Sequence, residues 1–153
     1  MTKLAEALIL RADYQKRIDQ LRQRAIRFAK VQEGDEPAEN PAAIADEIER
    51  LATDLVVLIQ RINRTNAATR LDDEGTIADA IARRDGLRLR HNFYTGLAEA
   101  AVAKQDRFTK SEVRFISTVD VGATQRRADN LAREYRELDT RLQAANWQVD
   151  LLD

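Results

Sequence analysis

The sequence predicts an all-α protein, an antiparallel bundle of four long helices with a short strand or extended arm before the last helix. Apolar residues recur at alternating spacings of three and four along most of the chain, which is typical of helices that pack through coiled-coil-like seams. Composition agrees, because 33% of the 153 residues are charged and 5% are aromatic, with five glycines and two prolines. Such a composition favours long helices with solvated faces. We expect a single helical domain over residues 1–153.

The first predicted helix runs from Thr2 to Lys30, with Thr2 as its N-cap. A single charged residue interrupts its otherwise largely apolar seam. The seam consists of Leu4, Ala7, Arg11, Tyr14, Ile18, Leu21, Ala25 and Phe28. Gly34 and Pro37 then end the helical pattern, so we expect a chain reversal after Lys30.

An acidic connector from Val31 to Pro41 precedes the second predicted helix. Its carboxylates lack the fixed spacing of a calcium loop, so no metal site is predicted. Asn40 is expected as the N-cap and Pro41 as the first helical residue. The seam of this helix contains Ile44, Ile48, Leu51, Leu55, Leu58 and Ile62, and it continues into Thr65 and Thr69. A second apolar stripe of Ala52, Val56 and Ile59 continues into Asn63 and Asn66.

A short connector is predicted from Leu71 to Gly75, before the third helix. Thr76 and Asp79 have the spacing of a capping box at its start. The seam of this helix is Ile77, Ala80, Arg84, Leu87, His91, Tyr94, Ala98 and Ala101, and Leu89, Phe93 and Leu97 lie on an adjoining face. The helix is expected to end near Gln105.

The pattern changes between Asp106 and Val119, where partial alternation predicts the short strand or extended arm. Ser117 or Thr118 is expected to cap the last helix. The seam of that helix is Val121, Ala128, Leu131, Tyr135, Leu138, Leu142, Ala145 and Val149. Trp147 lies off this seam, which indicates either a packed helix end or a contact with another subunit.

Polar residues replace apolar ones in the stretch from Ile62 to Asp85, where both stripes of the second helix end. Folding each helix back on its neighbour brings polar groups from four segments to one level. We predict a polar layer of Arg11, Asn63, Thr65, Asn66, Thr69, Asp79, Arg83, Arg84 and Asp139. The favoured interpretation is structural, with side chains that satisfy one another and fix register or oligomer order. The other is a pocket for an anion or metabolite at the N-terminus of the third helix.

Several function classes are disfavoured by the sequence. The absence of cysteine excludes disulfides, zinc–thiolate sites and thiol catalysis, and it fits a cytoplasmic location. A net charge of −1 makes nucleic acid and anionic membranes unlikely partners. The longest uncharged apolar run, Leu55 to Ile59, is far shorter than the roughly 20 residues of a spanning helix. No nucleotide-binding or hydrolase motif occurs, His91 is expected in the core, and no cofactor is predicted.

Several segments together resemble the septicolysin-like proteins, a family of small uncharacterised bacterial proteins. They include K-L-A-E-A-L-I-L-R-A-D, V-Q-E-G-D-E-P-A-E-N-P, I-N-R-T-N-A-A-T, T-I-A-D-A-I-A-R-R-D, F-I-S-T-V-D and R-E-Y-R-E-L-D-T with a closing N-W. The name of that family implies a cytolysin. No secretion signal, membrane-length segment or pair of amphipathic β-hairpins supports that activity, and the resemblance supplies no catalytic residues.

The leading functional interpretation is a cytoplasmic homo-oligomeric assembly or interaction protein. The predicted helices have apolar residues on two faces, and packing within one chain is expected to leave some of these residues exposed. The segment from Asp106 to Val119 is the first candidate for a contact between subunits. The alternative is a small-ligand binding protein or an enzyme that uses the polar layer. A cytolysin is a remote alternative. The sequence identifies neither a small-molecule ligand nor a partner.

Overall fold

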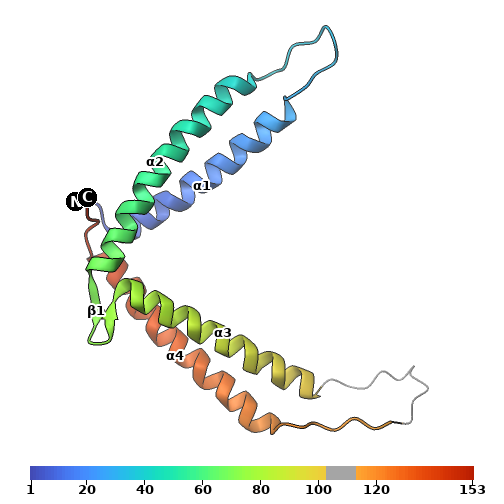
Figure 1. Ribbon diagram of the computed structural model, residues 1–153, viewed down its shortest axis with the longest axis vertical. Coiled ribbons are helices and arrows are strands. Elements are labelled where there is room, and N and C mark those ends of the chain that lie inside the picture. The colour runs from blue at the N-terminus through green and yellow to red at the C-terminus, as the bar shows by residue number, and fades with distance from the viewer. Residues whose placement is uncertain (103–112) are drawn as a thin grey trace. The chain divides into compact units, whose positions relative to one another are not determined.

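Four helices and one small β-hairpin follow one another in the computed structural model, which describes residues 1–102 and 113–153 (Figure 1). The elements are α1 (Leu4–Arg27), α2 (Pro41–Ala68), β1 (Arg70–Asp72), β2 (Gly75–Thr76), α3 (Ile77–Val102) and α4 (Val121–Gln148). Helix α1 pairs antiparallel with α2, and α3 with α4. The predicted all-α class with four long antiparallel helices is therefore confirmed.

The chain divides into two compact units. The first unit contains Met1–Arg70 together with Ala144–Asp153, and the second contains Leu71–Gln143. Helix α4 belongs mostly to the second unit, and its last residues belong to the first. The single domain expected over residues 1–153 remains a prediction.

In the first unit, α1 and α2 pack along the predicted seams. The buried seam residues are Leu4, Ala7, Leu21, Ile44, Leu58, Ile62 and Thr65. Helix α2 begins as predicted, because the Asn40 side chain accepts a hydrogen bond from the backbone N–H of Ala42 at 3.0 Å and Pro41 is the first helical residue. The seam periodicity of the sequence therefore identifies the packed faces of this hairpin.

The last residues of the chain close the first unit. The backbone N–H of Leu4 donates to the carbonyl of Val149 at 2.9 Å, and Leu151 donates to the carbonyl of Thr2 at 2.8 Å. Lys3 forms an ion pair with Asp150 at 2.8 Å. The prediction that Thr2 caps α1 is wrong, because Thr2 is held in this pairing and Lys3 is the N-cap.

In the second unit, α3 and α4 enclose a core of small and aliphatic side chains. Its buried members are Ile77, Ala80, Ala98, Ala128, Leu131, Leu138 and Leu142. The predicted capping box of α3 is confirmed, because the N–H of Thr76 donates to the Asp79 carboxylate at 2.8 Å and the N–H of Asp79 donates to the Thr76 hydroxyl at 3.2 Å. These bonds satisfy N–H groups that have no partner within the helix.

The start of α4 differs from the prediction that Ser117 or Thr118 caps it. The carboxylate of Asp120 accepts a hydrogen bond from the N–H of Ala123 at 2.9 Å, so Asp120 is the cap. The Ser117 hydroxyl forms a local turn instead, donating to the carbonyl of Val119 at 2.8 Å. The predicted end of the third helix near Gln105 lies outside the described residues, as does the first part of the predicted strand or arm. Its described part, residues 113–119, contains no strand.

The predicted connector from Leu71 to Gly75 contains most of a β-hairpin instead, formed by β1 and β2. Gly75 adopts a φ of +153°, and a Cβ atom built there would lie 2.5 Å from the carboxylate of Asp79. A side chain at this position would therefore clash with the capping box of α3. Glycine is needed because the hairpin backbone passes so close to the start of the helix.

Candidate functional site

Five predicted members of the polar layer belong to the first unit. Thr65 is fully buried, and its hydroxyl donates to the carbonyl of Arg61 at 2.8 Å and accepts from the N–H of Leu152 at 3.0 Å. This side chain anchors the end of the chain to α2. Asn63 is exposed, whereas Arg11, Asn66 and Thr69 are half-buried.

Four predicted members belong to the second unit. The guanidinium of Arg84 forms an ion pair with Asp139 at 2.7 Å, which joins α3 to α4. Arg83 binds both carboxylate oxygens of Asp72 at 3.0 Å and also pairs with Glu74. Asp79 serves in the capping box of α3. The structure thus brings Arg84 and Asp139 together. The single layer of all nine residues remains a prediction.

Asp72 is the centre of an ionic cluster that the sequence patterns did not identify. Besides Arg83, its carboxylate contacts Arg141 at 3.1 Å and accepts a hydrogen bond from the N–H of Glu74 at 3.0 Å. The hydrogen bond from the Arg83 guanidinium lowers the pKa of Asp72 from its ordinary value, and the same bond raises the pKa of Arg83. The acidic run from Asp72 to Glu74, nine positions before the two consecutive arginines Arg83 and Arg84 on α3, is the signal that could have indicated this cluster.

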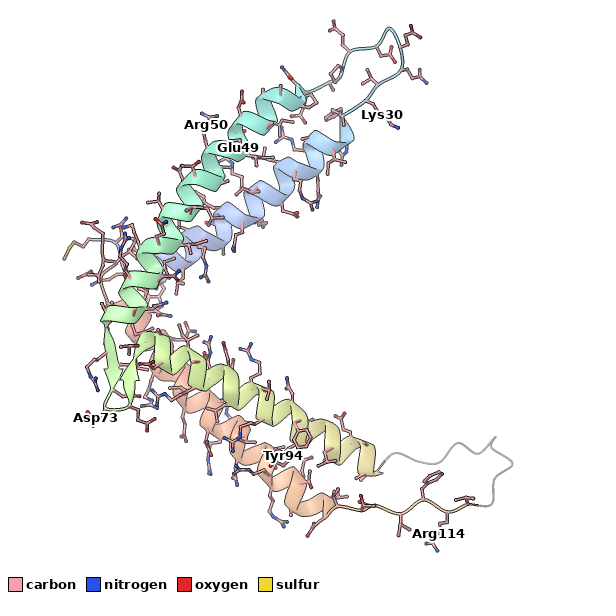
Figure 2. All side chains as sticks on the ribbon, in the orientation of Figure 1. Lys30, Glu49, Arg50, Asp73, Tyr94 and Arg114 are labelled. Atoms are coloured by element: carbon pink, nitrogen blue, oxygen red, sulfur yellow. The ribbon has the colours of Figure 1, made fainter. Side chains whose placement is uncertain are left out.

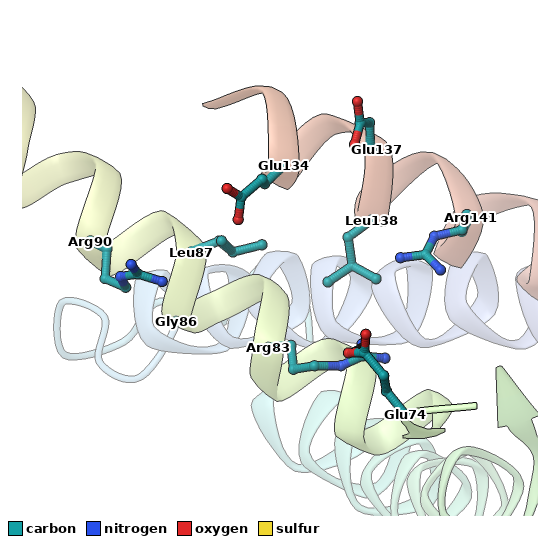
Figure 3. Close-up of a pocket in the computed structure, with 9 residues that line it drawn as sticks. All are labelled: Glu74, Arg83, Gly86, Leu87, Arg90, Glu134, Glu137, Leu138 and Arg141. Carbon is teal, nitrogen blue, oxygen red and sulfur yellow. Dashed lines mark hydrogen bonds and ion pairs between the residues drawn. The ribbon is translucent and has the colours of Figure 1, made fainter. Parts of the chain in front are cut away.

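A groove of about 470 Å³ lies in the second unit, lined by residues of α3 and α4 and by one residue of the β-hairpin (Figure 3). The lining residues are Glu74, Arg83, Gly86, Leu87, Arg90, Glu134, Glu137, Leu138 and Arg141. Figure 3 shows Arg83 and Arg90 on α3, with Glu134 and Glu137 on α4. The lining contains three arginines, three glutamates and two leucines. This lining can bind a polar ligand by ion pairing, because it offers charges of both signs.

The groove offers the carboxylates of three glutamates as acid–base groups. Its lining contains no histidine, serine or tyrosine, and no described group of three or more histidine or acidic side chains could hold a metal ion. His91 is half-buried and lies 3.4 Å from the Thr95 hydroxyl, one helical turn away on α3. Within the described helices, none is long and apolar enough to cross a membrane.

The comparisons with known proteins place the chain in an uncharacterised group. Residues 11–151 match the model of DUF6847, a family of unknown function. A solved structure, described as that of a functionally unknown conserved protein from Corynebacterium diphtheriae, is 43% identical over 99% of both chains, with a TM-score of 0.93. A search of curated proteins found no match.

These findings contradict the resemblance to septicolysin-like proteins. The matching family model covers nearly the same residues as the segments on which that resemblance was based, and it belongs to a different family. Most of those segments lie on helices and are rich in alanine and charged residues. Such residues recur in unrelated helical proteins because they favour helix formation.

Proposed function

We propose that this chain, which belongs to the DUF6847 family of unknown function, acts as a homo-oligomeric assembly or interaction module. The observation that carries the proposal is a set of large apolar side chains left in solvent. They include Leu89 at 71% exposure, Phe93 at 59%, Val56 at 54%, Trp147 at 58%, and Phe115 and Ile116 at 77% each. Burying such area is favourable by about 25 cal/mol per Å², so a surface with these side chains favours association.

Helix α2 supports the proposal because it is apolar over more of its circumference than one partner helix covers. Ile44, Leu58 and Ile62 are buried in the seam with α1. The second stripe of α2 consists of Ala52, Val56 and Ile59, which are spaced by four and three residues and therefore lie along one side of the helix, beside the seam. These three residues are partly or fully exposed. A helix with two apolar stripes is typical of a position between two neighbours.

The proposal is tested by measuring the mass of the protein in solution. We expect light scattering after size exclusion, at tens of micromolar (roughly the range in which specific interfaces persist), to give a multiple of 17.4 kDa. A species of 17.4 kDa across that range would contradict the proposal.

A second candidate function is the binding of a small anionic or zwitterionic ligand in the groove between α3 and α4. One observation favours it, because among the described residues the Nε atom of Arg83 is buried without a hydrogen-bond partner. The assembly function is better supported, since Asp72 and Glu74 already neutralise much of the charge of Arg83.

The ligand-binding candidate is tested by thermal shift with a panel of anions and amino acids. A ligand at about 100 times its dissociation constant stabilises a protein by roughly 2.7 kcal/mol, which a melting assay detects. The Arg90→Gln variant should lose the response. The Arg50→Gln variant is the matched control, because Arg50 is an exposed residue of α2 in the first unit (Figure 2). A panel without a shift in the wild type would remove this candidate.

A further inference from the structure

We infer that the outer face of α3 is a seam for a second copy of this chain, with the two α3 helices parallel. This inference rests on the proposed homo-oligomeric function and specifies its surface. The face contains six residues at spacings of four, three, four, three and four, which is a heptad pattern. They are Ala82, Gly86, Leu89, Phe93, Gly96 and Ala100, and all six are exposed. We call this set the outer stripe.

The outer stripe differs from the face of α3 that packs against α4. The inner face contains the buried Ala80 and Ala98, and its arginines reach α4, where Arg84 pairs with Asp139 and Arg88 donates to the hydroxyl of Tyr135 at 2.6 Å. Tyr94 also lies toward α4, with the guanidinium of Arg127 at 5.9 Å from its ring centroid (Figure 2). At 100° per residue, the outer stripe falls on the side of α3 turned away from these contacts.

Neither glycine of the outer stripe is required by a close contact within the described part of the chain. A Cβ atom added at Gly86 or at Gly96 would meet nothing within 4 Å. Glycine destabilises the interior of a helix relative to alanine, so its presence at both positions needs another reason. The close approach of a second helix would explain both glycines. Leu89 and Phe93, which lie between the two glycines, would then pack as knobs against the second helix.

The charges beside the outer stripe favour a second copy over an unrelated partner. Asp85, Asn92 and Glu99 occupy one flank, and Arg83 and Arg90 occupy the other, which also contains Leu97. In a parallel pair, Asp85 of one helix lies opposite the partner's Arg90, whereas Arg83 already pairs with Asp72 and Glu74 of its own chain. An antiparallel pair would set acid against acid and base against base. The pattern is therefore self-complementary in the parallel orientation.

Disulfide trapping tests both the surface and the orientation, because the natural chain contains no cysteine. Ala82 and Ala100 lie 18 residues apart on α3, about 27 Å along the helix, so a bridge from one position to the other reports an antiparallel pair. We expect Ala82→Cys alone and Ala100→Cys alone each to form a covalent dimer under mild oxidation. Bridging that requires a mixture of the two variants would overturn the parallel orientation. Bridging in neither single variants nor the mixture would overturn the seam.

Substitution of the knobs separates this inference from the broader proposal. The double variant Leu89→Lys, Phe93→Lys should weaken association by at least about tenfold, as loss of central apolar anchors does. The control is Ile26→Lys, because Ile26 is a 63% exposed residue of α1 in the first unit and does not belong to the outer stripe. Association that survives in the double variant but fails in the control overturns the seam and leaves the assembly function standing. A monomeric wild type overturns both.

Glycine replacement gives a second variant set that keeps the fold. Gly86→Ala and Gly96→Ala together should raise the melting temperature of the monomer, because alanine favours the helix. The same pair should weaken dimerisation, since two methyl groups then separate the helices. Unchanged or tighter association in this variant would contradict the close approach that the seam requires.

Discussion

The two helical hairpins of this chain both bury aliphatic side chains, and they differ in how much arginine contributes to the contact between the paired helices. Aliphatic side chains dominate the seam between α1 and α2, where Leu21, Leu58 and Ile62 are buried. Between α3 and α4, ion pairs and aromatic contacts of arginine accompany a core that includes several alanines. Arg84 reaches Asp139, and the Arg88 guanidinium lies 5.3 Å from the ring centroid of Tyr135. Helices with similar heptad patterns can thus use different stabilising interactions.

The difference follows from the residues at the seam positions. Leucine and isoleucine fill the space between α1 and α2, and each buried side chain contributes about 1.5–3 kcal/mol. The α3 seam has alanine at positions 80 and 98, with arginine at position 84. Long arginine side chains span the remaining distance to α4, because their aliphatic stems pack while their charged ends pair. The second hairpin therefore combines aliphatic burial with the Arg84–Asp139 ion pair between its two helices.

The largest expected change in the free energy of unfolding comes from a substitution in the aliphatic seam between α1 and α2. Ile62 is 1% exposed, so Ile62→Ala should destabilise the protein by about 2–5 kcal/mol through the lost methyl groups and the cavity left behind. Denaturant unfolding gives the free energy, and amide exchange should report the loss mainly in α1 and α2. A cost similar to that of an exposed substitution such as Val57→Ala would show that this seam is not the main support of the first hairpin.

A smaller effect is expected where the end of the chain meets α2. Thr65→Val keeps the shape but leaves the N–H of Leu152 without its acceptor, which should cost about 1–3 kcal/mol. Exchange of the amides near Leu151 should accelerate as the chain end loosens. Thr53→Val is the matched control, because the exposed Thr53 hydroxyl makes the same kind of bond to the carbonyl four residues earlier, at 2.9 Å. Equal costs for the two variants would contradict the anchoring role of Thr65.

The ionic contacts predict that acid weakens the protein. Hydrogen bonds from Arg83, Arg24 and Lys3 lower the pKa values of Asp72, Glu39 and Asp150 respectively. Their stabilising contributions are complete above the unfolded carboxyl values of about 4 and disappear as pH falls through the lower folded values. Unfolding midpoints measured from about pH 6 down to about pH 2 should therefore decrease. The Asp72→Asn variant should flatten this decrease, and a slope identical to that of the wild type would contradict the prediction.

The smallest effect is expected at a residue central to the predicted polar layer. Asn63 is exposed, so water satisfies its amide, and Asn63→Ala should change the free energy of unfolding by no more than about 0.5 kcal/mol. Alanine also favours the helix more than asparagine does, which offsets any lost contact. A loss comparable to that of Thr65→Val would show that Asn63 has a partner, and it would strengthen the case for a continuous layer.

Most of the helical architecture could be predicted because its signals are local. The heptad spacing identifies the packed faces, and Asn40 with Pro41 and Thr76 with Asp79 mark the starts of α2 and α3. The cap of α1 could not be assigned in this way. Thr2 has the residue type of an N-cap, but its backbone pairs with Leu151, almost the whole chain length away. Contacts of that sequence separation leave no local signal.

The candidate site was predicted less well for a similar reason. Arg83 and Arg84 were recognised as polar members of α3, and the antiparallel register placed Asp139 at the level where Arg84 meets it. The partners of Arg83 were missed, because Asp72 and Glu74 lie in a hairpin that the sequence suggested only as a connector. The sequence predicted only a short connector from Leu71 to Gly75, whereas the hairpin of β1 and β2 places Asp72 in contact with Arg83 of α3 and Arg141 of α4.

The pairing of Thr2 and Leu4 with residues 149–151 has a consequence for synthesis on the ribosome. Helices α1 and α2 of the first unit are translated early, but the buried Leu151 of the same unit is translated about 80 residues after α2 is complete. The α1–α2 hairpin must therefore remain incompletely covered while α3 and α4 emerge. During that interval, the end of this hairpin near Leu4 lacks the cover that Val149 and Leu151 provide in the folded chain.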